Sequence, residues 1–91
     1  MMLVLPARLT HEEAPACMRM LQQGVAGQSG SSVVVDAGAL AHFDSSALAV
    51  LLECRREASG LGRSFAVKGL PARLRELAAL YGVAGLLPAM P

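Results

Sequence analysis

The sequence predicts a single α/β domain spanning residues 1–91, in which a small, mixed or mostly parallel β-sheet packs against about three main α-helices. Three observations favour this fold class. Apolar strand-like runs alternate with amphipathic helical segments along the chain, which is the pattern of an α/β layer. The run Val33-Val34-Val35 has no polar alternation, as expected of a central parallel strand buried on both faces. A chain of 91 residues with 54% hydrophobic residues has the size of one domain with one core.

The first predicted unit is a short strand followed by a helix. Leu3-Val4-Leu5 is apolar and a proline follows it, which favours an edge strand because proline donates no ladder hydrogen bond. Thr10 and Glu13 have the spacing of a capping box, so a helix is expected to begin there. Pro15 is late for a first turn and indicates a start a few residues further on. The Gly- and Ser-rich segment from Gly24 to Ser32 is predicted to be a loop.

The second predicted unit starts with the valine run, which Asp36-Ala37-Gly38 ends. A connection from Ala39 to Phe43 leads to the second helix, with either Asp44 or Ser45 as its N-cap. Gly60 is expected to end this helix in a left-handed conformation.

The third predicted unit is a strand from Arg63 to Val67 and a helix that begins at Pro71, where proline is favoured. Gly82 is expected to end that helix. The segment from Val83 to Pro91 has room for a stub of strand or one more helical turn.

Composition argues against several classes of partner. Net charge is +1 and aromatic residues make up 3% of the chain, so neither a basic footprint nor stacking surface for nucleic acid is expected. No apolar run approaches the roughly 20 residues of a membrane span, and no signal peptide is recognised, so we expect a cytoplasmic protein without direct membrane insertion. In that reducing compartment Cys17 and Cys54 are predicted to be buried as small hydrophobic residues.

Polar residues gather before the second helix, where Asp44, Ser45 and Ser46 follow His42 by two positions. Helix capping alone explains these residue types. A hydrolase would use one serine as nucleophile with His42 and Asp44 as partners, but residues so close in sequence seldom converge in a triad, and no G-x-S-x-G elbow is present.

Two further kinds of chemistry can be weighed at this junction. His11 and His42 lack the spacing of a metal site, so neither a metal nor another cofactor is expected. Phosphorylation of Ser46 or Ser45 is compatible with a helix N-terminus, and the added charge beside Asp44 would block a partner packed on that surface.

One pattern joins the central strand to the second helix: Val33-Val34-Val35-Asp36, a short loop, and then Phe43-Asp44-Ser45-Ser46 followed by Ala47-Leu48-Ala49-Val50-Leu51-Leu52. This pattern resembles the signature of STAS domains, and the likeness covers nearly the whole chain. STAS domains are the small α/β domains found in anti-sigma factor antagonists, in the tails of anion transporters and in MlaB subunits of phospholipid transport systems. The ending Leu80-Tyr81-Gly82-Val83-Ala84-Gly85-Leu86-Leu87-Pro88 looks like that of the MlaB branch.

The resemblance implies a non-catalytic subunit that docks on the MlaF-like cytoplasmic ATPase of an ABC transporter and is peripheral to the inner membrane through that partner. The expected contact residues are His42, Asp44, Ser45, Ser46 and Ala47, with the exposed side of helix 45–58. In MlaB proteins the important residue directly follows the aspartate, which is Ser45 here. A capping role for Ser45 is expected to coexist with its role at the interface.

The resemblance leaves a second function open. In the antagonist branch the chain would bind an anti-sigma factor kinase and be phosphorylated on Ser46. Two departures from the family pattern stand out. Ala47 replaces a common glycine and is expected to add a methyl group to the contact surface. The first hairpin strand of the family has no counterpart, so the sheet is expected to be narrower, with an edge to be covered.

Overall fold

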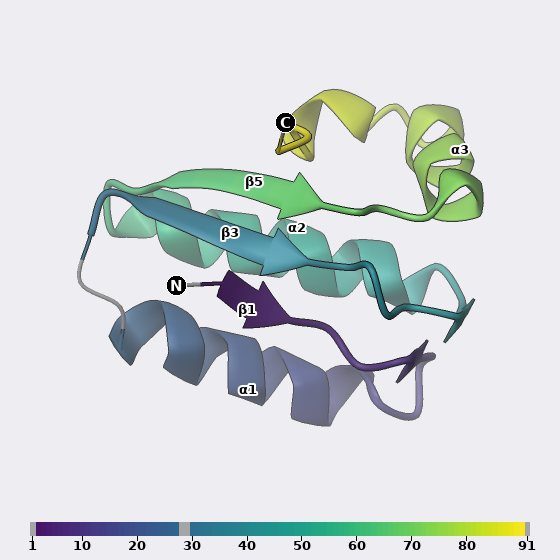
Figure 1. Cartoon of the computed structure of the whole chain (residues 1–91), viewed down its shortest axis with the longest axis horizontal. Helices are drawn as coiled ribbons and strands as arrows, with labels where there is room; N and C mark the ends of the chain where they lie inside the picture. The colour runs from purple at the N-terminus through teal and green to yellow at the C-terminus, as the bar shows by residue number, and fades with distance from the viewer. Residues whose placement is uncertain (1, 28–29, 91) are drawn as a thin grey trace.

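The computed structural model describes residues 2–27 and 30–90. The described residues form an alternating series of strands and helices, followed by one turn of 3-10 helix (Figure 1). In chain order the elements are β1 (Met2–Val4), β2 (Arg8–Leu9), α1 (Ala14–Gly27), β3 (Ser32–Asp36), β4 (His42–Phe43), α2 (Ser46–Gly60), β5 (Ser64–Lys68), α3 (Ala72–Leu80) and η1 (Ala84–Leu86). The α/β fold class is confirmed.

The main sheet has the strand order β1-β3-β5, and both pairs are parallel. β3 is therefore central and β1 lies at an edge, both as predicted. The segment after η1 adds an isolated parallel bridge between Val67 and Ala89 on the far side of β5, so the chain end contains both a helical turn and a strand stub. A separate parallel pair joins β2 to β4, which sequence patterns did not predict.

One face of the main sheet is buried and the other is partly open. Val33 and Val35 of β3 are fully buried, as are Leu21 of α1 and Leu51 of α2. α1 and α2 lie side by side in contact with each other, and α2 also contacts β5. Val34, on the opposite face, is only half-buried, so the expectation of burial on both faces is wrong for that residue.

The first helix starts a few residues after Thr10, as Pro15 indicated, but its C-terminal end differs from prediction. The carboxylate of Glu13 accepts the backbone N–H of Thr10 at 2.9 Å, which is one arm of the predicted capping box. The hydroxyl of Thr10 instead donates to the same carboxylate at 2.7 Å, and regular α-helix begins at Ala14. The helix continues to Gly27, through four residues predicted as loop, and Gly24 lies close to the side chain of Leu3.

The second helix also ends differently from prediction. α2 runs through Gly60, and the left-handed residue is Gly62, with φ of +70°. The N–H of Gly62 donates to the carbonyl of Ser59, and that of Arg63 to the carbonyl of Ala58, which satisfies the last turn. The third helix begins at Ala72 with Pro71 just before it.

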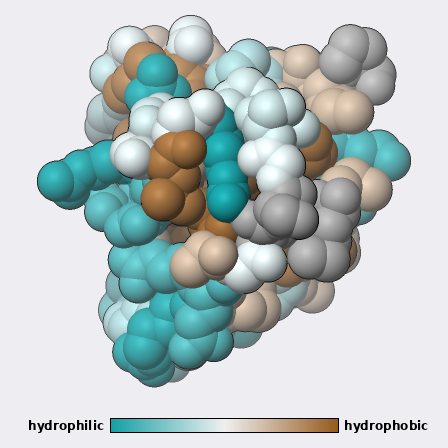
Figure 2. Space-filling model, turned by 90° about the vertical axis from the view of Figure 1, so that its left-hand side faces the viewer, coloured by the Kyte–Doolittle hydropathy of each residue, from teal (hydrophilic) through white to brown (hydrophobic). Residues whose placement is uncertain are grey.

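Figure 2 shows the end of the domain at which the strands of the main sheet begin. On this end hydrophobic side chains form small separate groups among hydrophilic ones. The polar junction and α3 lie at the opposite end, where the strands finish (Figure 1). Within the described residues no helix is long and apolar enough to cross a membrane.

Candidate functional site

The predicted polar junction lies between β4 and the first turn of α2. β4 pairs with β2, which brings this junction beside the turn that precedes α1. The N–H groups of Ala41 and His42 both donate to the carbonyl of Ala7, at 2.8 and 2.9 Å. These bonds hold the start of β4 against the residue that precedes β2. The junction is thus held by backbone hydrogen bonds before α2 begins.

Asp44 is the residue that caps α2. Its Oδ1 accepts the backbone N–H of Ser46 at 2.8 Å, and its Oδ2 accepts the backbone N–H of His11 at 3.0 Å. The backbone N–H groups of His11 and Ser46 lower the pKa of Asp44 to about 2, because they stabilise the ionised carboxylate. The ionised carboxylate therefore links the start of α2 to the turn before α1, two segments that are far apart in sequence.

Ser45 does not cap the helix. Its backbone is helical, with φ of −62° and ψ of −16°, and its side chain makes no capping hydrogen bond. The expectation that Ser45 serves both as cap and as interface residue is wrong in its first half, because an N-cap needs an extended backbone and Asp44 takes the role. Ser45 is exposed, and Ser46, the first residue of α2, is half-buried.

The other expected contact residues occupy different surroundings. His42, on β4, is exposed. Ala47 has no exposed surface, because it begins the apolar side of α2 that packs on the core. The expectation that its methyl group contributes to a contact surface is therefore wrong.

His11 also contacts the site, although no sequence pattern assigned it a role there. Besides its backbone bond, its ring Nδ1 lies 3.3 Å from Oδ2 of Asp44. The partners are separated by 33 positions, so no local pattern indicates the contact.

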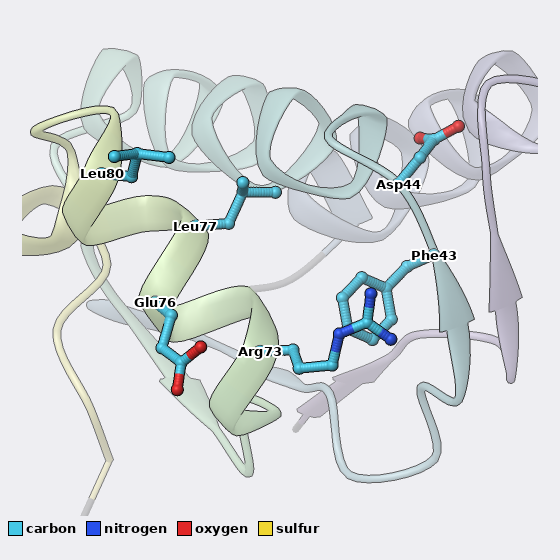
Figure 3. Close-up of a pocket in the computed structure, with 6 residues that line it drawn as sticks. All are labelled: Phe43, Asp44, Arg73, Glu76, Leu77 and Leu80. Atoms are coloured by element: carbon cyan, nitrogen blue, oxygen red, sulfur yellow. The ribbon is translucent and has the colours of Figure 1, made fainter.

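A groove of about 310 Å³ opens between the junction and α3 (Figure 3). Phe43 and Asp44 line one side, and α3 contributes the other lining residues, Arg73, Glu76, Leu77 and Leu80. The guanidinium of Arg73 lies over the ring of Phe43, with its central carbon 5.8 Å from the ring centroid. Sequence patterns did not predict this groove, because it depends on where α3 lies relative to β4.

The surface of α3 beside the groove is apolar and open. Leu80 is 80% exposed and Tyr81 is 58% exposed, which are high fractions for large side chains. Figure 3 shows Leu77 and Leu80 on the side of α3 that faces α2. The junction and this part of α3 therefore form one surface, which we call the tip surface: Ser45, Ser46 and the groove residues.

Within the described residues, His42, Asp44 and the two serines are not linked as a catalytic triad requires. Among the described residues no hydrogen bond joins His42 to Ser45 or Ser46, and the carboxylate of Asp44 accepts backbone N–H groups. In residues 2–27 and 30–90 no three His, Cys, Asp or Glu side chains cluster closely enough to hold a metal ion.

Comparison with protein families gives one match that covers nearly the whole chain. The family model described as "Mlab, STAS domain" matches residues 1–88. A search of curated proteins finds no similar sequence. The fold agrees with the match, since α2 begins at the Asp-Ser-Ser segment and follows the central strand. The chain therefore belongs to the MlaB-like family of STAS domains, a family that fits a non-catalytic role in protein interaction.

Proposed function

We propose that this chain is a non-catalytic subunit that binds the cytoplasmic ATPase of an Mla-type ABC transporter and supports its assembly and activity in phospholipid transport. It would stay at the cytoplasmic side of the inner membrane through that partner. Membership of the MlaB-like family supports this proposal. The proposal assigns the contact to the tip surface.

The exposed Ser45 hydroxyl is the observation that carries the proposal. Ser45 makes no capping bond of its own, so its side chain is free to face a partner. Asp44, which precedes Ser45, accepts the backbone N–H groups of Ser46 and of the distant His11. A segment that is already held in place loses little conformational entropy on binding, which favours association with a partner.

The burial of Ala47 excludes this residue from the proposed contact with the ATPase. Because Ala47 faces the core, the contact must run from Ser45 across the exposed side of α2 or toward α3. Ser45 is the residue at which a large substituent would disturb the contact without disturbing the core.

Binding of the purified host ATPase to Ser45→Arg tests the proposal, with Ser59→Arg as the matched control. Ser59 is also exposed and lies on the same helix, but at its other end. We expect Ser45→Arg to abolish co-purification with the ATPase and to leave the circular dichroism spectrum unchanged. Ser59→Arg is expected to bind as the unmodified chain does. Equal binding by both variants would contradict the proposal.

A second candidate function is an anti-sigma factor antagonist regulated at Ser46. Ser46 is the first residue of a 15-residue helix, where the helix dipole favours a phosphate. The backbone N–H of Ser46 is already bound to Asp44, so that phosphate would lie beside a carboxylate. Incubation with the host's anti-sigma factor kinases, followed by mass spectrometry of the peptide that contains Ser46, distinguishes the two functions.

A further inference from the structure

We infer that the groove between Phe43 and α3 receives one segment of the ATPase, in which an apolar side chain stands next to a single Asp or Glu. This inference rests on the proposed function and specifies the chemistry of the partner. It extends the contact from Ser45 to α3, which the Asp-Ser-Ser segment alone does not indicate.

The apolar part of the occupant follows from the lining of the groove. Phe43 and Leu77 are half-buried and form an apolar floor, while Leu80 leaves most of its surface open to solvent. A side chain of the size of Leu, Met or Phe would cover these three residues together. The groove volume of about 310 Å³ accommodates a side chain of that size.

The acidic part of the occupant follows from Arg73. No hydrogen bond or ion pair joins its guanidinium to any other residue that the structure describes. Its position over the Phe43 ring orders the guanidinium before a partner arrives. A guanidinium that stacks on an aromatic face keeps its N–H groups available for two-point hydrogen bonding to a carboxylate.

The remaining charges limit the occupant to one carboxylate. Asp44 and Glu76 also line the groove, and both are acidic. A run of acidic residues in the partner would be repelled by these two side chains. An isolated carboxylate that binds Arg73, beside an apolar residue that covers the floor of the groove, avoids most of that repulsion.

Equilibrium binding of the purified host ATPase, measured by calorimetry, tests the inference with two matched pairs of variants. Arg73→Gln is compared with Arg75→Gln, because Arg75 is exposed on the same helix and lines a different cavity. Leu80→Ala is compared with Leu61→Ala, because Leu61 is 52% exposed and follows the other end of α2. All four residues are exposed or nearly so, and circular dichroism verifies that each variant is folded.

We expect Arg73→Gln and Leu80→Ala each to weaken binding by roughly tenfold, which is typical of a truncated anchor at an interface. Arg75→Gln and Leu61→Ala are expected to change the affinity by less than about twofold. Affinity should also depend less on salt concentration in Arg73→Gln than in the unmodified chain, because one charge pair is lost.

The outcomes separate this inference from the proposed function. If Ser45→Arg abolishes binding while Arg73→Gln behaves like Arg75→Gln, the groove inference is overturned and the proposed function stands. If the unmodified chain does not bind the ATPase, both fall. If sedimentation shows that the chain alone forms a dimer that Leu80→Ala dissociates, the groove is occupied by a second copy and the inference is again overturned.

Discussion

Oδ2 of Asp44 accepts the backbone N–H of His11 at 3.0 Å, across 33 positions of sequence. The same carboxylate accepts the N–H of Ser46 through its other oxygen. One side chain therefore fixes the start of α2 and joins it to the turn before α1. This relationship explains why the junction can carry an exposed serine without becoming a mobile loop.

Replacement of Asp44 by alanine tests this role directly. The variant loses the cap of α2 and the link to His11, so we expect its Tm to fall by about 4–8 °C, which is typical for the loss of a cap in a domain of this size. Ser45→Ala is the control. Because Ser45 makes no capping bond, its replacement is expected to change the free energy of unfolding by less than about 0.5 kcal/mol. An equal loss in the two variants would show that Asp44 is not the cap.

The same bonds predict how stability responds to acid. Backbone hydrogen bonds lower the pKa of Asp44 from 3.8 to about 2, and the bond from the backbone of Thr10 is the main cause that lowers the pKa of Glu13 from 4.5 to about 2. The folded state therefore holds both carboxylates ionised at a pH at which the unfolded chain binds protons. Their stabilising effect is complete above about pH 5 and is lost as pH falls through about 2.

Urea unfolding between pH 6 and pH 2 measures this loss. The unfolding midpoint of the unmodified chain is expected to fall mainly below pH 4. In the double variant Asp44→Asn, Glu13→Gln that acid-dependent decrease should be smaller, although the variant is less stable at pH 6. Parallel pH profiles for the two proteins would contradict the assignment.

Local patterns were sufficient to predict the central strand and the order of the elements. The valine run, the apolar periodicity of α2 and Pro71 before α3 each express a preference within a few residues of sequence. The position of Asp44 and Ser45 at a helix start was predicted for the same reason. The choice of Asp44 as cap depended on His11, which approaches from the first unit.

The incorrect predictions involve contacts between distant segments. The Gly- and Ser-rich pattern predicts a loop at Gly24, but a methyl group there would lie 2.5 Å from Cδ2 of Leu3, so its lack of a side chain allows α1 to approach β1. The groove of the tip surface has the same origin, since Phe43 and Arg73 belong to different units. Neither relationship leaves a periodic pattern in the sequence.

The cysteines offer a check on the core that does not depend on any partner. Cys17 and Cys54 are both buried and free. Burial raises the pKa of the Cys54 thiol to about 11 and also raises that of Cys17. At pH 8 neither thiol should react with Ellman's reagent in the folded protein within minutes, and both should react at once in 6 M guanidinium chloride. Rapid reaction of one thiol before unfolding would show that α1 and α2 separate more readily than their packing indicates.

Gly69 connects β5 to α3 and thereby positions one wall of the groove. Its φ is +70°, and a methyl group added to it would lie 3.1 Å from Cα of Gly38. Gly62 has the same φ of +70° but open space around it. Gly62→Ala should therefore cost about 1–2 kcal/mol from backbone strain alone. Gly69→Ala should cost roughly 1–2 kcal/mol more, because a backbone atom blocks the new methyl group. Urea unfolding of the two variants measures the difference, and equal costs would show that Gly69 does not lie against Gly38 in the folded protein.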